Sequence, residues 1–332
     1  MRENLILDYN GLKKYIENNY YAISMRDGVC SHCSWKLQCA KNIRWCVDTS
    51  LSKQQSHILR RALKHLPSNI VWKLFVKSYL PCDSTVAEII PALPLIEDEY
   101  NALGDERSKE TLIGMLMYRL TLDEAYPIYL NHNSKQYFVE ELCNLGPDEI
   151  VIDCGAFTGD TLEEYLNHNA PPLKYYLFES NIDNIAQIEH TVEKCDAKGY
   201  SEIKPYGIWS ENGTLWYSPS RYGGAGGGYI SNVPKKHSVA VHVVTIDDVV
   251  PLNETVTLIK MDIEGAEQEA IKGAKNTIKH SKPKLAICTY HKSEDMWNIF
   301  NLIHKNFPEY KHYYMRHYHN RSYGDTVLYA YG

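Results

Sequence analysis

The chain has 332 residues, of which 44% are hydrophobic and 23% charged, so we expect a globular protein with one large or two smaller domains. Its net charge of −6 gives no basic field for nucleic acid, which argues against a nucleic-acid partner. The first residues contain no apolar segment of signal-peptide length, and no apolar run reaches the length of a membrane span. We therefore expect a cytoplasmic protein.

The first part of the chain has the apolar spacing of helices. Leu12, Tyr15 and Ile16 share one face, and similar stripes follow further along. Helices are expected at residues 11–20, 54–66 and 108–122, whereas Pro81, Pro91 and Pro94 predict loops before the last of them. We interpret residues 1–134 as a mainly helical N-terminal domain and residues 135–332 as a second domain.

Four cysteines stand close together in the first domain. They follow the spacing C-x2-C-x5-C-x6-C and are Cys30, Cys33, Cys39 and Cys46. Thiolates this close could bind zinc tetrahedrally or hold an iron–sulfur cluster. His32 could replace one of them as a ligand, and free thiols in a helical hairpin are the structural alternative.

From residue 148 onward, short apolar runs alternate with helical segments, which predicts a mostly parallel sheet. Strands of this sheet are expected at residues 150–153, 175–180, 201–210, 257–261 and 284–289, and further strands at 214–218 and 239–246. Helices are expected at 161–166, 181–195 and 293–307. Residues 313–318 and 326–330 predict a C-terminal antiparallel hairpin.

The turn after the first of these strands reads D-x-G-A-x-x-G-D. It is not the dinucleotide fingerprint, because Phe157 stands where a second glycine is needed, and it is not a Walker loop, because no Lys-Ser/Thr follows. Acidic side chains suit a ligand with a cationic end and hydroxyls, such as S-adenosylmethionine. The candidate cofactor-binding residues are Asp153, Gly155, Ala156, Phe157, Thr158, Gly159 and Asp160. A strand–helix turn without a ligand is the alternative.

Further acidic residues follow other strands of the predicted sheet. Glu179, with Ser180 beside it, ends the second strand and is placed to accept hydrogen bonds from ribose hydroxyls. Gly207 and Ile208 on the third strand complete the predicted cofactor pocket, together with Asp262 after the fourth.

The predicted reaction centre comprises Asp262, Glu264 and His291, which follow the fourth and fifth strands. The two carboxylates could bind Mg²⁺, or one could take a proton from a hydroxyl, and His291 is a candidate general base. The structural alternative is that Glu264 only places a negative charge near a helix N-terminus, where it interacts favourably with the helix dipole. The glycine-rich segment 222–229 is expected to close over an acceptor as a lid.

These motifs, in this order, resemble the FkbM family of S-adenosylmethionine-dependent methyltransferases. The resemblance covers residues 135–332, and its most specific part is K-x-D-x-E-G-A-E, which begins at Lys260. It implies a class I methyltransferase (Rossmann-like) α/β fold and O-methylation of a sugar or natural-product-like acceptor. It also implies that the first loop holds the methionine end of the cofactor and Glu179 the ribose, and that the fourth and fifth strands are neighbours.

Two other functions remain open. One is a non-catalytic binding or scaffold module of the same fold that recruits a partner through its Cys-rich N-terminal domain. The other is a nicotinamide-dependent oxidoreductase. Phe157 argues against it, because this residue departs from the dinucleotide-binding fingerprint. The acceptor, a small molecule or a glycan, and the formation of a homo-oligomer are not fixed by the sequence.

Overall fold

The structure, a computed structural model, describes residues 5–19, 82–121, 123–132, 135–139, 142, 145–219, 228–235, 237–320 and 324–332. Several sequence predictions fall outside the described residues. These are the four-cysteine cluster, the helix at 54–66, the loop at Pro81 and residues 222–227 of the expected lid. They stay predictions.

The chain divides into two compact units. The described residues of the first unit come from 1–100, 109–131 and 319–323, and those of the second from 101–108, 132–318 and 324–332. The helices of the N-terminal part are α1 (Tyr9–Asn19), α6 (Cys82–Ala102), α7 (Glu106–Thr121) and α8 (Ala125–Leu130). The helices predicted at 11–20 and 108–122 are thus confirmed, while the predicted division after residue 134 stays a prediction.

The predicted loops at Pro91 and Pro94 are wrong, because α6 continues through both prolines. Each proline removes one backbone hydrogen bond of a helix. The neighbouring side chains explain why the helix persists, since Ile89 and Ile96 are fully buried and Ala92 is nearly so. Tertiary burial here outweighs the local preference against helix.

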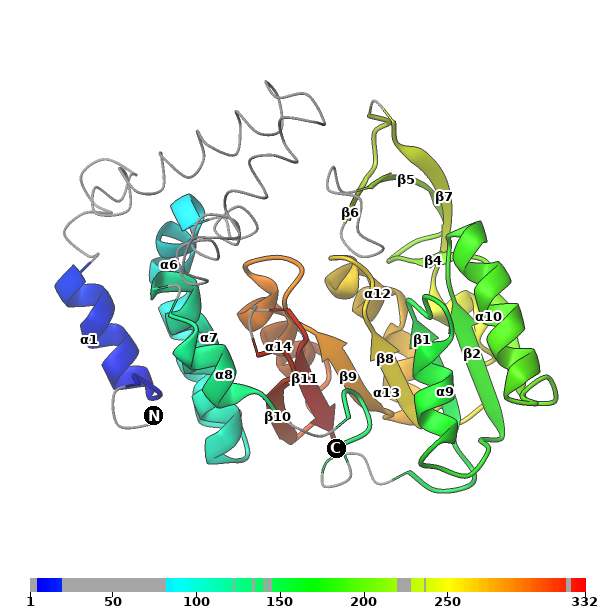
Figure 1. The fold of residues 1–332 in the computed structure, drawn as a ribbon, viewed down its shortest axis with the longest axis horizontal. Coiled ribbons are helices and arrows are strands. Elements are labelled where there is room, and N and C mark those ends of the chain that lie inside the picture. The colour runs from blue at the N-terminus through cyan, green and yellow to red at the C-terminus, as the bar shows by residue number, and fades with distance from the viewer. Residues whose placement is uncertain are drawn as a thin grey trace, which may run out of the picture. The chain divides into compact units, whose positions relative to one another are not determined.

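A seven-stranded sheet forms the centre of the second unit, in the order β10-β11-β9-β8-β1-β2-β3 (Figure 1). Its strands are β1 (Ile150–Cys154), β2 (Lys174–Phe178), β3 (Ser201–Lys204), β8 (Leu258–Met261), β9 (Lys284–Cys288), β10 (His312–His317) and β11 (Thr326–Tyr331). The first five are mutually parallel, and β10 and β11 pair antiparallel. The predicted fold class, with its C-terminal hairpin, is confirmed.

Helices connect the parallel strands. They are α9 (Asp160–Leu166), α10 (Ile182–Lys194), α11 (Ile246–Val249), α12 (Glu267–Gly273), α13 (Lys275–Ser281) and α14 (Asp295–Asn306). Asn181 caps α10 by accepting a hydrogen bond from the N–H of Asp183. Among the helices of the described residues, none is long and apolar enough to cross a membrane.

A second sheet departs from the sequence prediction. The strand expected at 201–210 splits into β3 and β4 (Gly207–Ile208), and β4 joins β5 (Gly213–Pro219), β6 (Gly228–Ser231) and β7 (Val239–Val244) in the order β4-β7-β5-β6. The split falls at Pro205, which has no N–H to continue the pairing with β2.

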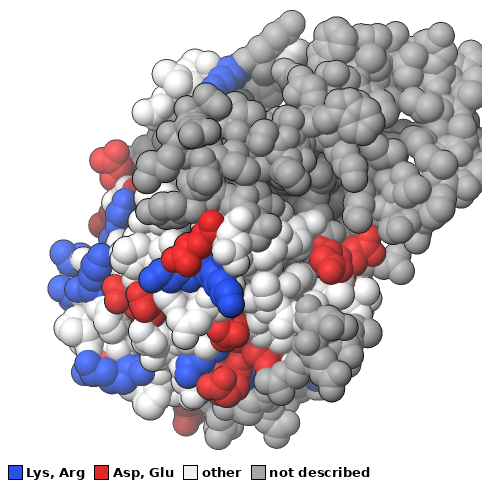
Figure 2. Space-filling model, turned by 90° about the vertical axis from the view of Figure 1, so that its left-hand side faces the viewer, with Lys and Arg blue, Asp and Glu red and all other residues white. Residues whose placement is uncertain are grey.

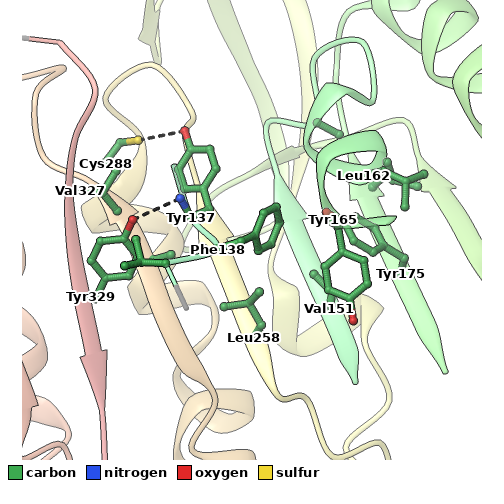
Figure 3. Close-up of a cluster of buried hydrophobic side chains, with 14 of the residues drawn as sticks. Tyr137, Phe138, Val151, Leu162, Tyr165, Tyr175, Leu258, Cys288, Val327 and Tyr329 are labelled. Carbon is green, nitrogen blue, oxygen red and sulfur yellow. Dashed lines mark hydrogen bonds between the residues drawn. The ribbon is translucent and has the colours of Figure 1, made fainter. Parts of the chain in front are cut away.

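Aromatic side chains build much of the core beside the central sheet (Figure 3). Tyr165 of α9 packs edge-on between Phe138 and Tyr175 of β2, with ring centroids 5.5 and 5.7 Å away. Edge-to-face pairs of this kind add about 0.5–1.5 kcal/mol each beyond the burial of their area. The core therefore includes residues from the segment before β1.

The outer strand β10 is shielded by residues 101–108. Leu103 forms a parallel bridge with Tyr313, and the Arg316 guanidinium contacts both carboxylate oxygens of Asp105 at 2.7 and 3.2 Å. Covering an edge strand removes a template for pairing with other chains. On the face drawn in Figure 2, acidic and basic side chains are interspersed over the described surface.

Candidate active site

Four parallel neighbours, β9, β8, β1 and β2, end at one edge of the central sheet. In an open α/β sheet this carboxyl edge is where ligands bind. Every catalytic residue predicted from the sequence follows β8 or β9, and the predicted acidic loops follow β1, β2 and β8. The fold therefore brings these side chains to one place.

The loop after β1 has the backbone of a tight ligand-binding turn. Gly155 and Gly159 have φ of +83° and +81°, and Phe157 between them has φ of +47°. A Cβ added at Gly155 would lie 2.0 Å from the carbonyl oxygen of Asp262, so only glycine fits there. A strained non-glycine residue at such a loop is typical of functional sites.

Glu179, after β2, ties the first loop to the second. Its carboxylate accepts hydrogen bonds from the N–H of Phe157 at 3.1 Å and of Asn181 at 2.8 Å. The N–H groups of Gly155 and Ala156 also donate to the carbonyl of Phe178. The predicted pairing of the two acidic loops is present, and each Glu179 oxygen retains a lone pair for a ligand hydroxyl.

Asp153 is fully buried, and Lys260 Nζ lies 2.9 Å from its Oδ1. The same Nζ donates to the carbonyl of Gly155 at 2.8 Å. Burial lowers the pKa of Lys260, but the negative charges of Asp153 and Asp262 outweigh burial, so its pKa is raised and it stays charged. The Asp153 carboxylate thus faces a lysine of the chain, and its predicted contact with a ligand stays a prediction.

Asp262 follows β8 and is held by two tyrosines. Tyr137 Oη donates to Oδ2 at 2.9 Å, and Tyr290 Oη donates to Oδ1 at 3.0 Å. Burial raises the pKa of Asp262, but Lys260, His291 and the two hydroxyls outweigh it and lower the pKa below its ordinary value. Asp262 is therefore an ionised, oriented carboxylate.

His291 lies between carboxylates on both sides of its ring. Nδ1 is 2.8 Å from Glu267, whereas Nε2 is 3.3 Å from Asp262 and 3.7 Å from Glu264. Burial lowers its pKa, but the three carboxylates outweigh burial and raise the pKa to about 9. At neutral pH a ring with this pKa is mostly protonated, which disfavours the predicted role of His291 as a general base.

The loop between β8 and α12 sets the directions of the Asp262, Glu264 and Glu267 side chains. Glu264 and Gly265 have φ of +57° and +91°, and the N–H of Ile263 donates to Oε1 of Glu267 at 2.9 Å. Glu267 is fully buried, while the side chains of Asp262 and Glu264 are 28% and 32% exposed. Of these three carboxylates, that of Glu267 is therefore buried, whereas those of Asp262 and Glu264 are partly accessible from outside.

The remaining predicted cofactor residues lie on several different elements of the fold. Gly207 and Ile208 stand on β4 of the second sheet, and Ile208 is buried. The Thr158 carbonyl accepts a hydrogen bond from Thr191 of α10, Asp160 begins α9, and Ser180 follows Glu179. Their cofactor contacts stay predictions.

One residue of the second sheet lies near this carboxyl edge. Burial and then the negative charges of Glu264 and Glu179 raise the pKa of Tyr217 on β5. Tyr217 is therefore within electrostatic reach of two of the acidic loops.

Oxygen and nitrogen atoms of Asp262, Glu267 and His291 lie within 4.8 Å of one another, a spacing that could hold a cation. The residues do not fit the Mg²⁺ predicted between Asp262 and Glu264, however. A protonated His291 already faces these two carboxylates, with Nε2 3.3 Å from Asp262 and 3.7 Å from Glu264. Mg²⁺ also prefers an all-oxygen octahedral site. The imidazolium is the cation that these carboxylates bind.

Sequence reasoning missed Tyr137 and Tyr290 and assigned no role to Lys260. Two of these residues could have been found from the sequence, because Lys260 belongs to the K-x-D-x-E-G-A-E motif and Tyr290 stands next to His291. No sequence pattern pointed to Tyr137.

A family model, the methyltransferase FkbM domain, matches residues 153–323, more than half of the chain. The chain belongs to the FkbM methyltransferase family. The solved structure of methyltransferase FkbM from Methylobacillus flagellatus is similar, with a TM-score of 0.63 and 26% identity over 74% of this chain. This chain covers 62% of that protein's length.

An rRNA methylase from Streptococcus thermophilus also matches, with a TM-score of 0.37 and 13% identity over 58% of this chain and 90% of that one. That likeness is too low to carry an argument about function. No curated protein matches the chain significantly.

Proposed function

We propose that this FkbM methyltransferase transfers the methyl group of S-adenosylmethionine to a hydroxyl of a sugar or natural-product-like acceptor. The observation that carries the proposal is the set of acidic loops around a positive-φ glycine turn at the carboxyl edge of β1, β2 and β8. The sulfonium of S-adenosylmethionine supplies an electrophilic methyl group.

The donor set fits this cofactor. Gly155 lets the first loop pack directly against the Asp262 backbone, and Glu179 offers acceptor lone pairs for ribose hydroxyls. The partly exposed carboxylates of Asp262 and Glu264 attract a cationic ligand.

The chain's own residues then align the reaction and take the proton. Asp262 and Glu264 accept the hydrogen bond of the acceptor hydroxyl, and the leaving proton goes to one of these carboxylates. Positioned proton acceptors of this kind contribute about 10²–10⁴-fold in rate. His291, protonated, holds both carboxylates in place from the buried side.

The first experiment is calorimetric titration of the purified protein with S-adenosylmethionine. We expect saturable binding, weakened at least tenfold in Asp153→Ala because the Asp153–Lys260 pair that supports the first loop is lost. A folded protein without measurable binding would refute the proposal and leave the scaffold module as the alternative.

The second experiment assigns the acceptor. Protein and methyl-labelled S-adenosylmethionine are incubated with a panel of hydroxylated sugars and natural products, with Asp262→Asn as the matched control. Label is expected on an acceptor oxygen, and the control should lower turnover by about 10²-fold or more. Label on nitrogen or carbon would refute O-methylation while leaving cofactor binding intact.

A further inference from the structure

Tyr137 lies before β1, ahead of residues 153–323 that match the family model. Its side chain nevertheless reaches Asp262, which is 125 positions later in the chain. Tyr137 is 7% exposed, so its hydroxyl depends on protein atoms for hydrogen bonds. The predicted site thus receives a group from outside the matched region.

The hydroxyl of Tyr137 is oriented by its neighbours. Gln136 Nε2 donates to Tyr137 Oη at 2.9 Å, which leaves the phenolic proton for Asp262 Oδ2 at 2.9 Å. The Lys260 ammonium lies 5.2 Å from the ring centroid. Burial is the main cause that raises the pKa of Tyr137 well above its ordinary value, and the neighbouring Cys288 and Asp262 raise it further, so the hydroxyl keeps its proton and remains a donor.

The backbone of Tyr137 is fixed as well. Its φ is +70°, an uncommon conformation for a bulky residue, and its N–H donates to Tyr329 Oη of β11 at 3.1 Å. Figure 3 shows this bond, with the phenol of Tyr137 directed toward Cys288 at 3.5 Å. A local strain of this kind persists only when surrounding contacts hold it.

We propose that Tyr137 is a positioning residue for Asp262, so that the proposed methyltransferase site of this chain includes a residue from the segment that precedes β1 and the residues matched by the family model. Tyr137 and Tyr290 each donate to a different oxygen of the Asp262 carboxylate and so fix its plane. Donors to a carboxylate also stabilise its ionised form. The inference rests on the proposed function only for the consequence of this arrangement in catalysis.

Other charged or titratable groups also face Asp262 and must be kept constant in any test. They are Asp153 of β1, Lys260 of β8, Glu264, Glu267 of α12, Cys288 of β9, and Tyr290 and His291 after β9. Tyr137→Phe removes one oxygen and leaves all of these in place. The ring, with its contacts to the core and to Lys260, is retained.

The direct test measures the pKa of Asp262 by carbon NMR on protein with labelled aspartate carboxyls, with the signal assigned by its loss in Asp262→Asn. In Tyr137→Phe we expect this pKa to rise by about one unit or more, since hydrogen bonds to charged groups contribute about 1.5–3 kcal/mol. The matched control is Tyr310→Phe, which loses a buried hydroxyl bond to the Pro283 carbonyl at 2.6 Å. Both variants lose a buried hydrogen bond, so melting temperature does not separate them, but the control should leave the Asp262 pKa unchanged.

An unchanged Asp262 pKa in folded Tyr137→Phe overturns the inference. If that variant does not fold, Tyr329→Phe releases the N–H of Tyr137, and a smaller rise of the same sign is expected. No rise there overturns the inference in the same way.

The catalytic consequence is tested separately. With a methyl acceptor in hand, Tyr137→Phe should lower kcat about tenfold with little change in KM, and should shift the acid limb of the pH–rate profile to higher pH. Equal profiles for Tyr137→Phe and wild type overturn the inference. Failure of the wild type to bind S-adenosylmethionine refutes the proposed function instead, and leaves the NMR result standing.

Discussion

Replacing Gly155 by alanine tests whether the contact between the first loop and the loop after β8 builds the proposed cofactor site. Gly155 has φ of +83°, where a side chain costs about 1–2 kcal/mol. The new Cβ would also lie 2.0 Å from the Asp262 carbonyl oxygen, so the two loops must move apart.

Moving the loops breaks identifiable bonds. Gly155 N–H donates to the Phe178 carbonyl at 2.9 Å, and Lys260 Nζ donates to the Gly155 carbonyl at 2.8 Å. At about 1 kcal/mol each, their loss brings the expected destabilisation to roughly 3–4 kcal/mol. For a domain of this size, that lowers the melting temperature by on the order of 10 °C.

The assay combines thermal melting with calorimetric titration of S-adenosylmethionine. Gly155→Ala should melt lower and bind at least tenfold more weakly. Gly199→Ala is the control, because a Cβ there meets nothing within 4 Å, and it should stay within about 0.5 kcal/mol of wild type. If the two variants behave alike, the contact between the loops does not build the cofactor site.

Three further predictions concern charge and metal. The pKa of His291 is raised to about 9 in the folded chain, so its stabilisation is full below about pH 6.5 and is lost as pH rises to about 9. Urea unfolding should show this loss, on the order of 3 kcal/mol, in wild type but not in His291→Asn. S-adenosylmethionine affinity should be the same with added Mg²⁺ or with chelator, and a strong rise with Mg²⁺ would contradict the pairing described for Asp262. Elemental analysis should find zinc or iron near one equivalent, and a chain with Cys30 and Cys33 changed to serine should lose it.

Much of the site could be predicted because parallel strands gather their carboxyl ends at one edge. Asp153, Glu179 and Asp262 each follow an apolar run bounded by turn signals, so recognising the strands was enough to bring their loops together. The turn after β1 could also be recognised from Gly155 and Gly159, because both positions have a positive φ, which favours glycine.

What could not be predicted depends on contacts between distant positions. Tyr137 lies in a segment without periodicity, and only the folded chain shows that it meets Asp262. The protonation of His291 depends likewise on the burial of Glu267 beside it, which no local pattern encodes. The continuous helix through Pro91 has the same origin, because burial of its neighbours decides the outcome.

The charges of the site also favour a cationic ligand over a neutral one. Asp153 pairs with Lys260, and His291 shares one positive charge among Asp262, Glu264 and Glu267. Of these three, Asp262 and Glu264 are partly exposed and leave negative charge accessible at the carboxyl edge of the sheet. S-adenosylmethionine carries a sulfonium charge that its demethylated product lacks, so we infer that this field binds the donor more strongly than it binds the product. Asp262→Asn should therefore weaken the donor more than the product in paired titrations, by about tenfold in the ratio of affinities for one charge-assisted contact. If both ligands weaken equally, Asp262 acts on the adenosine or methionine part that they share, and the sulfonium is recognised elsewhere.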